Sequence, residues 1–566
     1  MKKKFLWIGC VVLLGWLLEC EAEKPNILFI MSDDHTWQAV GAYESRFTHL
    51  NPTPNLDALA KRGMVFDRAI CGNAICTPSR ASIMTGQYSH LNGVMTLDDR
   101  LPEAKQYLAH EMKQAGDQTA IIGKWHLRDL PTAFDYYKVL PGQGKYFNPE
   151  FFESGQKKKF IEEGHSTDCI MDSALDWFQT RRDPNEPFFL KLHFKAPHDY
   201  FENAPRYDEY LAEVAMPEPL SLWDRGEGSI ATRGVEGELE RVIGTSIGRR
   251  NFRRSYDADW EVAEHLTDSE AKRAAYNVYM KKYLRCVKGV DDNLGRLFAY
   301  LEKEGLMENT LIIYTGDQGF FLGEHDMQDK RWAYEPSVRM PLIVSYPGAI
   351  KGGTRSGAIV ENIDFPATML DFAGVEVPSY MQGRSFRSLL ETGEEAQDWK
   401  RAAYYQYWMH MAHHDVPGHI AMRTKGYKLI LFYGTAGTPA FRSDRSKFPT
   451  PAAWELYDLK KDPTERHNVY DDPAYKVVRD KLKKQFKRLR AEVKAGQPVE
   501  GSHALSAAEV LAVNQAIEEN WEYDAAAAMR AKKASAAYAE RFADPDKCEP
   551  YIVPWLRPGN LDPSEL

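Results

Sequence analysis

Four short apolar runs, each ending in polar or ionisable residues, constrain the fold of this 566-residue chain more than any other feature. NILFIM (26–31), QTAII (118–122), PFFLKLHF (187–194) and TLIIYT (310–315) have the length and composition of buried strands. Helical patterns lie between them, for example at 55–63 and 279–305. This alternation predicts an α/β fold with a mostly parallel central sheet flanked by helices.

Polar residues follow each predicted strand directly. The four sets are Ser32, Asp33, Asp34 and His35; Gly123, Lys124, Trp125 and His126; Lys195, Ala196, Pro197 and His198; and Gly316, Asp317, Gln318 and Gly319. In doubly wound sheets, ligands bind outside the carboxyl ends of the strands. We therefore expect these side chains to converge on one site.

Asp33, Asp34, Asp317 and Gln318 offer three carboxylates and one amide oxygen. An all-oxygen set of this kind suits Ca²⁺ or Mg²⁺ far better than zinc. A single acidic pair after a strand is more often a helix cap. Acids at two separate strand ends favour the metal site, although spacing alone leaves both interpretations open.

Lys124, His126, His198 and Lys330 form a second set. The lysines could neutralise an anionic ester, and the histidines could exchange protons near neutral pH. Taken singly, each is typical of a turn or a solvated surface. The functional interpretation requires that they share one pocket, and it then predicts a metal-assisted hydrolase of an anionic ester.

Cys76 opens the stretch CTPSRASIMTGQ (76–87), which continues with a helical pattern. A cysteine at a helix N-terminus could be a nucleophile with a lowered pKa. No Cys/His protease signature accompanies it, however, and hard-metal ligands suit a thiolate poorly. The residues by themselves leave the role of Cys76 open.

Composition excludes some classes of function. With 43% hydrophobic and 27% charged residues the chain is typical of a globular protein, and a net charge of −9 without blocks of like charge argues against a nucleic-acid surface. An anionic substrate therefore needs a local basic pocket. The five cysteines beyond residue 22 include no CxxC pair, so neither a disulfide scaffold nor a zinc ribbon is indicated.

The N-terminus reads as a secretory signal. MKKK precedes the short apolar run FLWIGCVVLLGWLL, which predicts export to the periplasm or medium, cleavage after Ala22 and no stable membrane span. Lipid attachment at Cys20 is the weaker alternative, because Glu19 stands where a small residue is expected. The predicted organisation is a signal peptide (1–22), a catalytic domain (23–395), a smaller C-terminal α+β domain (396–495) and an extension (496–566).

The C-terminal regions have distinct patterns. Short antiparallel strands are expected from about 401, followed by a basic amphipathic helix at 476–494. The extension contains an alanine-rich stretch with helical propensity and a tail with several prolines.

The motifs together resemble those of type I sulfatases. CTPSR (76–80), continued by Thr85 and Gly86, resembles the CxPxR signature, and NILFIMSDD, GKWH, APH, DQGFFLGEH and DKRWAYEPSVRMPLIV follow in the family's order. The resemblance covers about residues 24–490. It implies an alkaline-phosphatase-like fold and sulfuric ester hydrolase activity.

Residue roles are implied by this resemblance. A sulfatase-maturating enzyme would convert Cys76 to formylglycine, whose hydrate attacks sulfur and carries the sulfate transiently. Ca²⁺ would be bound by Asp33, Asp34, Asp317, Gln318 and the residue derived from Cys76; Gln318 departs from the more usual Asn or His. Arg80, Lys124 and Lys330 would hold the hydrate and the sulfate, His126 would assist deprotonation, and His198 would protonate the leaving oxygen.

Two further stretches, 134–151 and 279–296, resemble the N-acetylglucosamine-6-sulfatase and mucin-desulfating branch. This implies a sulfated carbohydrate, with a 6-O-sulfated amino sugar as the first hypothesis. The candidate substrate contacts are His165, Arg331, Trp332 and Trp408, with the cluster His410, His413 and His414. A phosphonate or phosphate ester hydrolase and a non-catalytic binder of sulfated glycans remain the alternatives.

Overall fold

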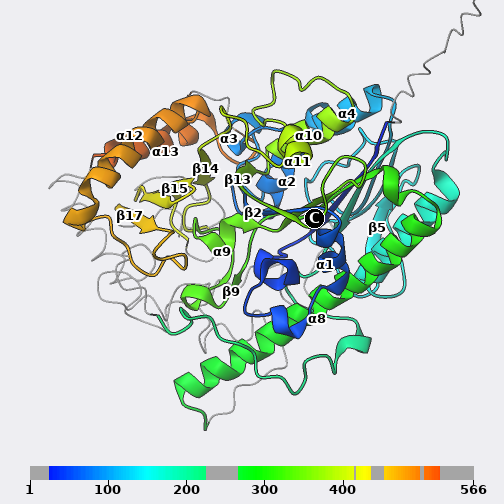
Figure 1. Cartoon of the computed structure of the whole chain (residues 1–566), viewed down its shortest axis with the longest axis horizontal. Helices are drawn as coiled ribbons and strands as arrows, with labels where there is room; N and C mark the ends of the chain where they lie inside the picture. Colours follow the sequence, from blue (N-terminus) through cyan, green and yellow to red (C-terminus); the bar gives the residue numbers. More distant parts are fainter. Residues whose placement is uncertain (1–23, 225–264, 413–415, 435–451, 498–501, 523–566) are drawn as a thin grey trace, which may run out of the picture.

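The computed structural model describes residues 24–224, 265–412, 416–434, 452–497 and 502–522 (Figure 1). The predicted signal peptide, the alanine-rich stretch and the proline-containing tail lie outside these residues. Among the described residues, no helix is both long enough and apolar enough to cross a membrane.

Five parallel strands form the centre of the main sheet. β1 (Asn26–Ser32) lies between β8 (Thr310–Gly316) and β7 (Phe188–Phe194), and β3 (Gln118–Lys124) and β4 (Tyr136–Leu140) follow on the β7 side. All four strands predicted from the apolar runs are therefore present and adjacent. Their carboxyl ends lie along one edge of the sheet, which brings the polar residues after them together.

The margins of the sheet are largely antiparallel, so the sheet as a whole is mixed. On one side lie β12 (Leu342–Ser345), β2 (Met64–Ile70) and β11 (Arg339–Met340), with β13 (Thr354–Glu361) parallel to β2. On the other side β5 (Glu150–Glu153) and β6 (Phe160–Ile161) are antiparallel to their neighbours. The predicted parallel strands form the centre of the sheet, and β13 adds a parallel pair at the margin.

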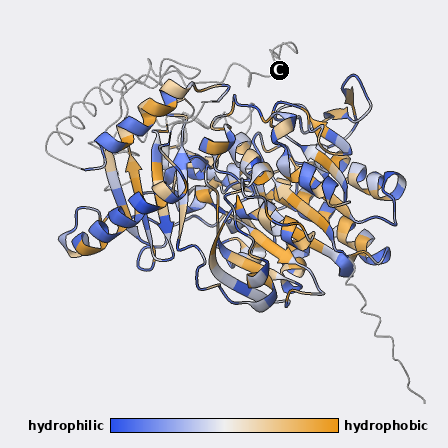
Figure 2. Ribbon diagram, turned by 90° about the horizontal axis from the view of Figure 1, so that it is seen from above, coloured by the Kyte–Doolittle hydropathy of each residue, from blue (hydrophilic) through white to orange (hydrophobic). Residues whose placement is uncertain are grey.

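Helices cover both faces of the sheet, because the central strands are apolar on both sides. In β1, Ile27, Phe29 and Met31 pack into one core, whereas Leu28 and Ile30 pack into the other. The first core is covered by α2 (Cys76–Thr85), α4 (Tyr107–Gln114), α10 (Asp364–Phe372) and α11 (Arg387–Thr392); the second by α1 (Pro54–Lys61), α5 (Ser166–Asp176) and α8 (Asp268–Lys303) (Figure 1). The central strands stand out as hydrophobic in Figure 2.

A second, smaller sheet lies at one side of the molecule (Figure 1). Its antiparallel strands are β14 (Ala402–Tyr407), β15 (His419–Thr424), β16 (Tyr427–Phe432) and β17 (Ala453–Asp458). α12 (Lys476–Glu492) packs against this sheet through Leu482 and Phe486, as expected for the predicted basic amphipathic helix. α13 (Ala507–Glu519) lies in the extension that was predicted to be helical, before the alanine-rich stretch, and Ser506 and Glu509 form a capping box that marks its start.

Short elements complete the connections: α3 (Ser89–Asn92), the hairpin of β9 (Phe321–Leu322) and β10 (Gln328–Asp329), and α9 (Glu335–Val338). The cysteines in the described part of the chain, Cys71, Cys76, Cys169 and Cys286, form no disulfide.

Candidate active site

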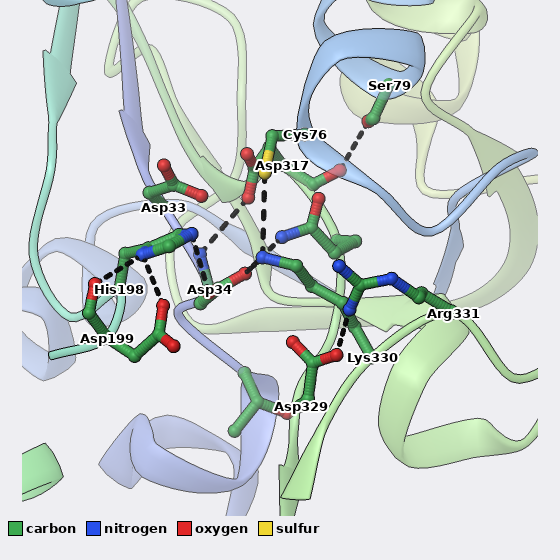
Figure 3. A network of polar contacts seen from close by, with 12 residues as sticks. Asp33, Asp34, Cys76, Ser79, His198, Asp199, Asp317, Asp329, Lys330 and Arg331 are labelled. Atoms are coloured by element: carbon green, nitrogen blue, oxygen red, sulfur yellow. Dashed lines mark hydrogen bonds and ion pairs between the residues drawn. The ribbon is translucent and has the colours of Figure 1, made fainter. Parts of the chain in front are cut away.

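The polar strand ends meet in one cluster (Figure 3). Asp33 and Asp34 follow β1, Asp317 and Gln318 follow β8, and His198 comes four residues after the end of β7. Lys124 is the last residue of β3, and Lys330 enters from the loop after β10. The structure therefore unites the residues predicted from separate strands, and it adds Cys76 and Arg80 from α2.

Three carboxylates form the centre of the cluster. Oxygens of Asp33, Asp34 and Asp317 lie within 4.8 Å of one another. The Asp34 N–H donates to Asp317 Oδ1 at 3.1 Å, and Gln318 Nε2 donates to Asp34 Oδ1 at 2.5 Å. Within the described residues, Asp33 Oδ1, Asp34 Oδ2 and Gln318 Oε1 are buried and accept no hydrogen bond. Such oxygens fit a hard cation, since a buried acceptor without a partner is otherwise costly.

Basic side chains surround these carboxylates. Arg80 donates from Nε to Asp317 Oδ2 at 3.0 Å and from Nη1 to the Lys124 carbonyl at 2.7 Å. Lys124 pairs with Asp33, and Lys330 pairs with Asp34. These contacts provide the local basic pocket that an acidic protein needs for an anionic substrate.

Burial and mutual repulsion perturb the charged groups. Burial raises the pKa of Asp34 to about 6, although Lys330 opposes the shift. Burial also acts to raise the pKa of Asp317, but Arg80, Lys330 and Lys124 together outweigh it and hold that pKa below its ordinary value. The pKa of Lys124 lies well below its usual range because the side chain is buried and has Lys195 and Lys330 as neighbours.

Asp34 has a backbone conformation that few residues other than glycine adopt, with φ of 64°. Tyr283 of α8 stabilises it, because its hydroxyl donates to the Asp34 carbonyl at 2.7 Å and accepts from the Thr36 N–H at 3.0 Å. Strained backbone of this kind persists where the surroundings hold it and clusters at functional sites.

Cys76 is the first residue of α2, so the positive end of the helix faces the cluster. Its Sγ lies 3.5 Å from Lys330 Nζ. Burial raises the pKa of the Cys76 thiol to about 11 despite this lysine, so the unmodified thiol is protonated at neutral pH. Burial therefore opposes the lowered thiol pKa that a cysteine nucleophile would need.

The remainder of α2 is buried along its whole length. The Ser79 hydroxyl donates to the Asp317 carbonyl, and Asn362 Nδ2 donates to Ser79 Oγ at 3.0 Å. Gly86 ends the helix with φ of 66°, and a side chain there would meet Met381 at 2.8 Å. These contacts lock the helix that carries Cys76 and Arg80 against the strand end that carries Asp317.

The two predicted histidines differ in how they are held. His198 has its Nδ1 2.7 Å from Asp199 Oδ1, and its Nε2 lies 3.7 Å from Asp34 Oδ2. His126 adopts φ of 55°, and its carbonyl accepts from Thr77 Oγ1 at 3.1 Å. Burial, followed by Lys124, lowers the pKa of both rings well below the usual value, so both are neutral at pH 7.

Asp199 and Gln143 were not predicted as part of the cluster, and Lys195 was named only as a strand-end residue without a role. Asp199 holds His198, Lys195 lies 4.6 Å from the centre of the Tyr146 ring, and Gln143 accepts from Lys124 Nζ at 2.5 Å. Lys195 and Asp199 flank the APH motif, and their position next to this motif could have indicated that they belong to the site. Gln143 comes from the loop after β4, and nothing in its sequence context indicates the contact.

Two of the predicted substrate contacts are wrong because their rings are buried. Trp332 has no exposed surface and packs between Tyr334 and His419. Trp408 is 4% exposed and belongs to the core of the smaller sheet. Neither ring face is free to stack on a sugar.

His165 is also engaged in structure. It caps α5 by accepting from the Thr167 N–H at 3.4 Å, and its Nε2 lies 2.9 Å from the Glu202 carbonyl. His410 is buried and accepts from the Gly418 N–H at 2.8 Å. His413 and His414 lie outside the described residues, whereas Arg331 lies beside Lys330 and pairs with Asp329 (Figure 3).

An α/β sheet with acidic oxygens, lysines and an arginine around one helix N-terminus fits the class of hydrolases of anionic esters, and its carboxylates could hold a metal ion. A model of the sulfatase family matches residues 25–375, and a model described as N-sulphoglucosamine sulphohydrolase, C-terminal, matches residues 323–492. The chain belongs to the sulfatase family, and the protein is a sulfatase, an enzyme that hydrolyses sulfuric esters.

Individual relatives agree with this assignment. The N-acetylglucosamine-6-O-sulfatase of Bacteroides thetaiotaomicron is 39% identical over 515 residues, which cover 85% of this chain and 88% of that protein. A solved structure of a complex with the substrate D-glucosamine-2-N,6-O-disulfate has a TM-score of 0.74 and 38% identity, and covers 84% of this chain and 99% of that one. The phosphonate monoester hydrolase of Agrobacterium radiobacter, at 20% identity, a TM-score of 0.62 and coverage of 83% and 96%, shares the fold.

Proposed function

We propose that this sulfatase releases the 6-O-sulfate from N-acetylglucosamine or a related glucosamine unit of a glycan. The observation that carries the proposal is the 39% identity, over 85% of the chain, to an N-acetylglucosamine-6-O-sulfatase. The similarity to a structure with a bound glucosamine disulfate supports the same class of substrate.

Calcium is the proposed metal, and Asp33, Asp34, Asp317 and Gln318 would hold it with the oxygen of residue 76. The buried oxygens that accept no hydrogen bond support this set, because Ca²⁺ prefers carboxylate and amide oxygens. When bound, the cation would withdraw charge from the sulfate oxygens. Gln318 supplies the same type of atom as the more usual Asn, on a longer side chain.

Residue 76 is the proposed nucleophile after conversion of Cys76 to formylglycine by a maturating enzyme. The modified side chain would supply a hydrate oxygen that attacks sulfur. Its position at the N-terminus of α2, 3.5 Å from Lys330 Nζ, supports this role, since the helix dipole favours negative charge there. An oxygen also removes the mismatch between a thiol and hard-metal ligands.

The basic residues would bind and orient the sulfate. Lys124 pairs with Asp33 and Lys330 pairs with Asp34, so both ammonium groups lie beside the carboxylates, where they can neutralise sulfate oxygens, and Arg80 can hold the hydrate. Their aliphatic stems are buried, so the ammonium and guanidinium groups are held in place before the substrate arrives.

The histidines would handle the protons. His198 is oriented by Asp199, whose carboxylate and carbonyl accept from Nδ1, so Nε2 can give a proton to the sugar oxygen as the sulfur–oxygen bond breaks only from a ring that has first taken up a proton. His126, whose Nδ1 has no hydrogen-bond partner among the described residues, can accept a proton from the hydrate because its ring is neutral. Both assignments follow the family analogy.

Export is part of the proposal. The apolar run behind MKKK supports secretion with cleavage after Ala22, and an extracellular or periplasmic glycan is then the accessible substrate.

Matured enzyme assayed against defined sulfated mono- and oligosaccharides, with sulfate release measured, tests the proposal. We expect 6-O-sulfated N-acetylglucosamine to be turned over best, and Cys76→Ala to fold normally but lose nearly all turnover. Mass spectrometry must first confirm formylglycine at position 76. Preference for a phosphodiester, or glycan binding without sulfate release, would overturn the proposal in favour of a phosphoester hydrolase or a non-catalytic binder.

A further inference from the structure

The loop that presents Lys330 has an unfavourable backbone on both sides of the lysine. Asp329 has φ of 72° and Arg331 has φ of 87°, values that few residues other than glycine adopt. Lys330 itself is buried, with its Nζ paired with Asp34 and 3.5 Å from Cys76 Sγ. A loop of this kind keeps its shape only where the surrounding structure holds it.

A tyrosine of the smaller sheet holds this loop. The Tyr405 hydroxyl, on β14, donates to the Arg331 carbonyl. Tyr405 is 3% exposed, and its ring stacks on His419 at 5.4 Å, which in turn stacks on Trp332 at 6.1 Å. Burial raises the pKa of Tyr405 well above its usual range, so the phenol remains a hydrogen-bond donor at any working pH.

The same strand also contacts the segment that leads into α2. The Gln406 N–H donates to the Gly72 carbonyl at 3.0 Å. Gly72 is four residues before Cys76. β14 therefore connects the segment that carries residue 76, through the Gln406 backbone, with the loop that carries Lys330, through the Tyr405 hydroxyl.

We propose that Tyr405 is a positioning residue of the reaction: its hydroxyl fixes the separation between Lys330 Nζ and the side chain of residue 76. The inference rests on the proposed function only in the role of Lys330 as a sulfate-binding group. It assigns to the C-terminal sheet a part in sulfate binding, through one hydrogen bond to a strained loop.

Tyr405→Phe removes this hydroxyl and keeps the stacked ring. Tyr334→Phe is the matched control, because Tyr334 is equally buried, lies four residues after Lys330 and also donates to the smaller sheet, at Glu455 Oε2 2.8 Å away. With an aryl sulfate as substrate, we expect Tyr405→Phe to lower kcat/KM about tenfold and to raise the inhibition constant for inorganic sulfate, and Tyr334→Phe to change neither by more than about twofold.

A crystal structure of Tyr405→Phe provides a readout that does not depend on turnover. We expect Lys330 Nζ to leave its position against Asp34 and residue 76. Normal kinetics and sulfate inhibition in Tyr405→Phe, equal losses in Tyr334→Phe, or an unmoved Lys330 would each overturn the inference. Equal formylglycine content in all variants, checked by mass spectrometry, excludes an effect on maturation.

The choice of substrate separates this inference from the proposed function. An aryl sulfate contains no sugar, so a wrong assignment of the glycan leaves the result unaffected. If the wild type did not turn over the aryl ester, calorimetry would measure the dissociation constant for inorganic sulfate instead. We then expect weaker sulfate binding in Tyr405→Phe and unchanged binding in Tyr334→Phe.

Discussion

The active-site cluster and a second buried cluster of Glu335, Arg423, Lys428 and Glu465 contain similar groups but differ in how their oxygens are paired. In the second cluster, which we call the docking cluster, Arg423 contacts both oxygens of Glu335, at 3.1 and 3.0 Å. Lys428 lies 2.9 Å from Glu335 and 2.6 Å from Glu465 Oε1, and Glu465 Oε2 accepts from the Glu335 N–H at 2.6 Å. Every carboxylate oxygen there has a hydrogen-bond or ion-pair partner, and for Glu465 Oε1 that partner is the ion-paired Lys428 alone, without hydrogen-bond geometry.

In the active site, by contrast, Asp33 Oδ1 and Gln318 Oε1 have no hydrogen-bond partner among the described residues. A buried set of paired charges can anchor one element to another, here α9 to the smaller sheet. A buried cluster whose acceptor oxygens have no hydrogen-bond partner can bind a ligand that is not part of the protein chain. The difference predicts that the active-site cluster gains stability from a metal and the docking cluster does not.

The largest expected effect is on turnover. Asp33→Asn removes a negative ligand and leaves Lys124 without its carboxylate, so kcat/KM for a sulfate ester should fall by at least about 10³-fold while the fold is retained. Asp176→Asn, at an exposed carboxylate at the end of α5, is the control and should be active. Turnover within tenfold of wild type would contradict the assignment of Asp33.

Glu335→Gln should affect stability most. The substitution leaves Arg423 without its buried counter-charge and Lys428 with Glu465 alone, and breaking a buried pair costs about 3–5 kcal/mol of the free energy of unfolding. Asp398→Asn, which breaks an exposed pair with Arg384, should cost less than about 1 kcal/mol. Denaturant unfolding measures both, and equal losses would remove the contrast between buried and exposed pairs.

Calcium should distinguish the two clusters directly. At about one hundred times its dissociation constant, a ligand that binds only the folded state adds about 2.7 kcal/mol. We expect Ca²⁺ to raise the thermal midpoint of the wild type and of Glu335→Gln, but not of Asp33→Asn. A rise that persists in Asp33→Asn would show that the cation binds elsewhere.

The smallest effect concerns pH. Burial raises the pKa of Glu465 to about 7, although Lys428 opposes it. Because the folded-state pKa exceeds the ordinary value of 4.5, Glu465 contributes stability that is complete below about pH 4.5 and is lost as the pH rises through about 7. Glu465→Gln cannot titrate, so the difference in thermal midpoint between pH 5 and pH 8 should be smaller in the variant than in the wild type. An unchanged difference would refute the raised pKa.

Much of the fold and the core of the candidate site could be predicted from the sequence. The apolar runs that became β1, β3, β7 and β8 are short and bounded by polar residues, so local pattern was sufficient to find them. Since parallel strands bring their carboxyl ends to one edge, the convergence of Asp33, Lys124, His198 and Asp317 followed from the fold class.

Contacts between distant segments were not predictable in this way. Trp332 looked like a substrate contact because it stands close to Lys330, but the smaller sheet covers it with His419. His165 looked like a substrate contact because it stands in a polar loop, but it caps α5. In both cases the deciding partner is tertiary, and an aromatic or histidine side chain has the same local signature whether it faces solvent or a core.

By itself, the sequence determined which chemical groups are available: the acidic strand ends, the lysines, the arginine of CTPSR and a cysteine at a helix start. These follow from residue type and spacing, which local physical chemistry controls. Only the tertiary structure decided which oxygens remain unpaired, which rings are buried, and that Tyr405 of the smaller sheet reaches the loop of Lys330. Those outcomes depend on packing between segments far apart in the chain, because burial and hydrogen-bond pairing are properties of the assembled core.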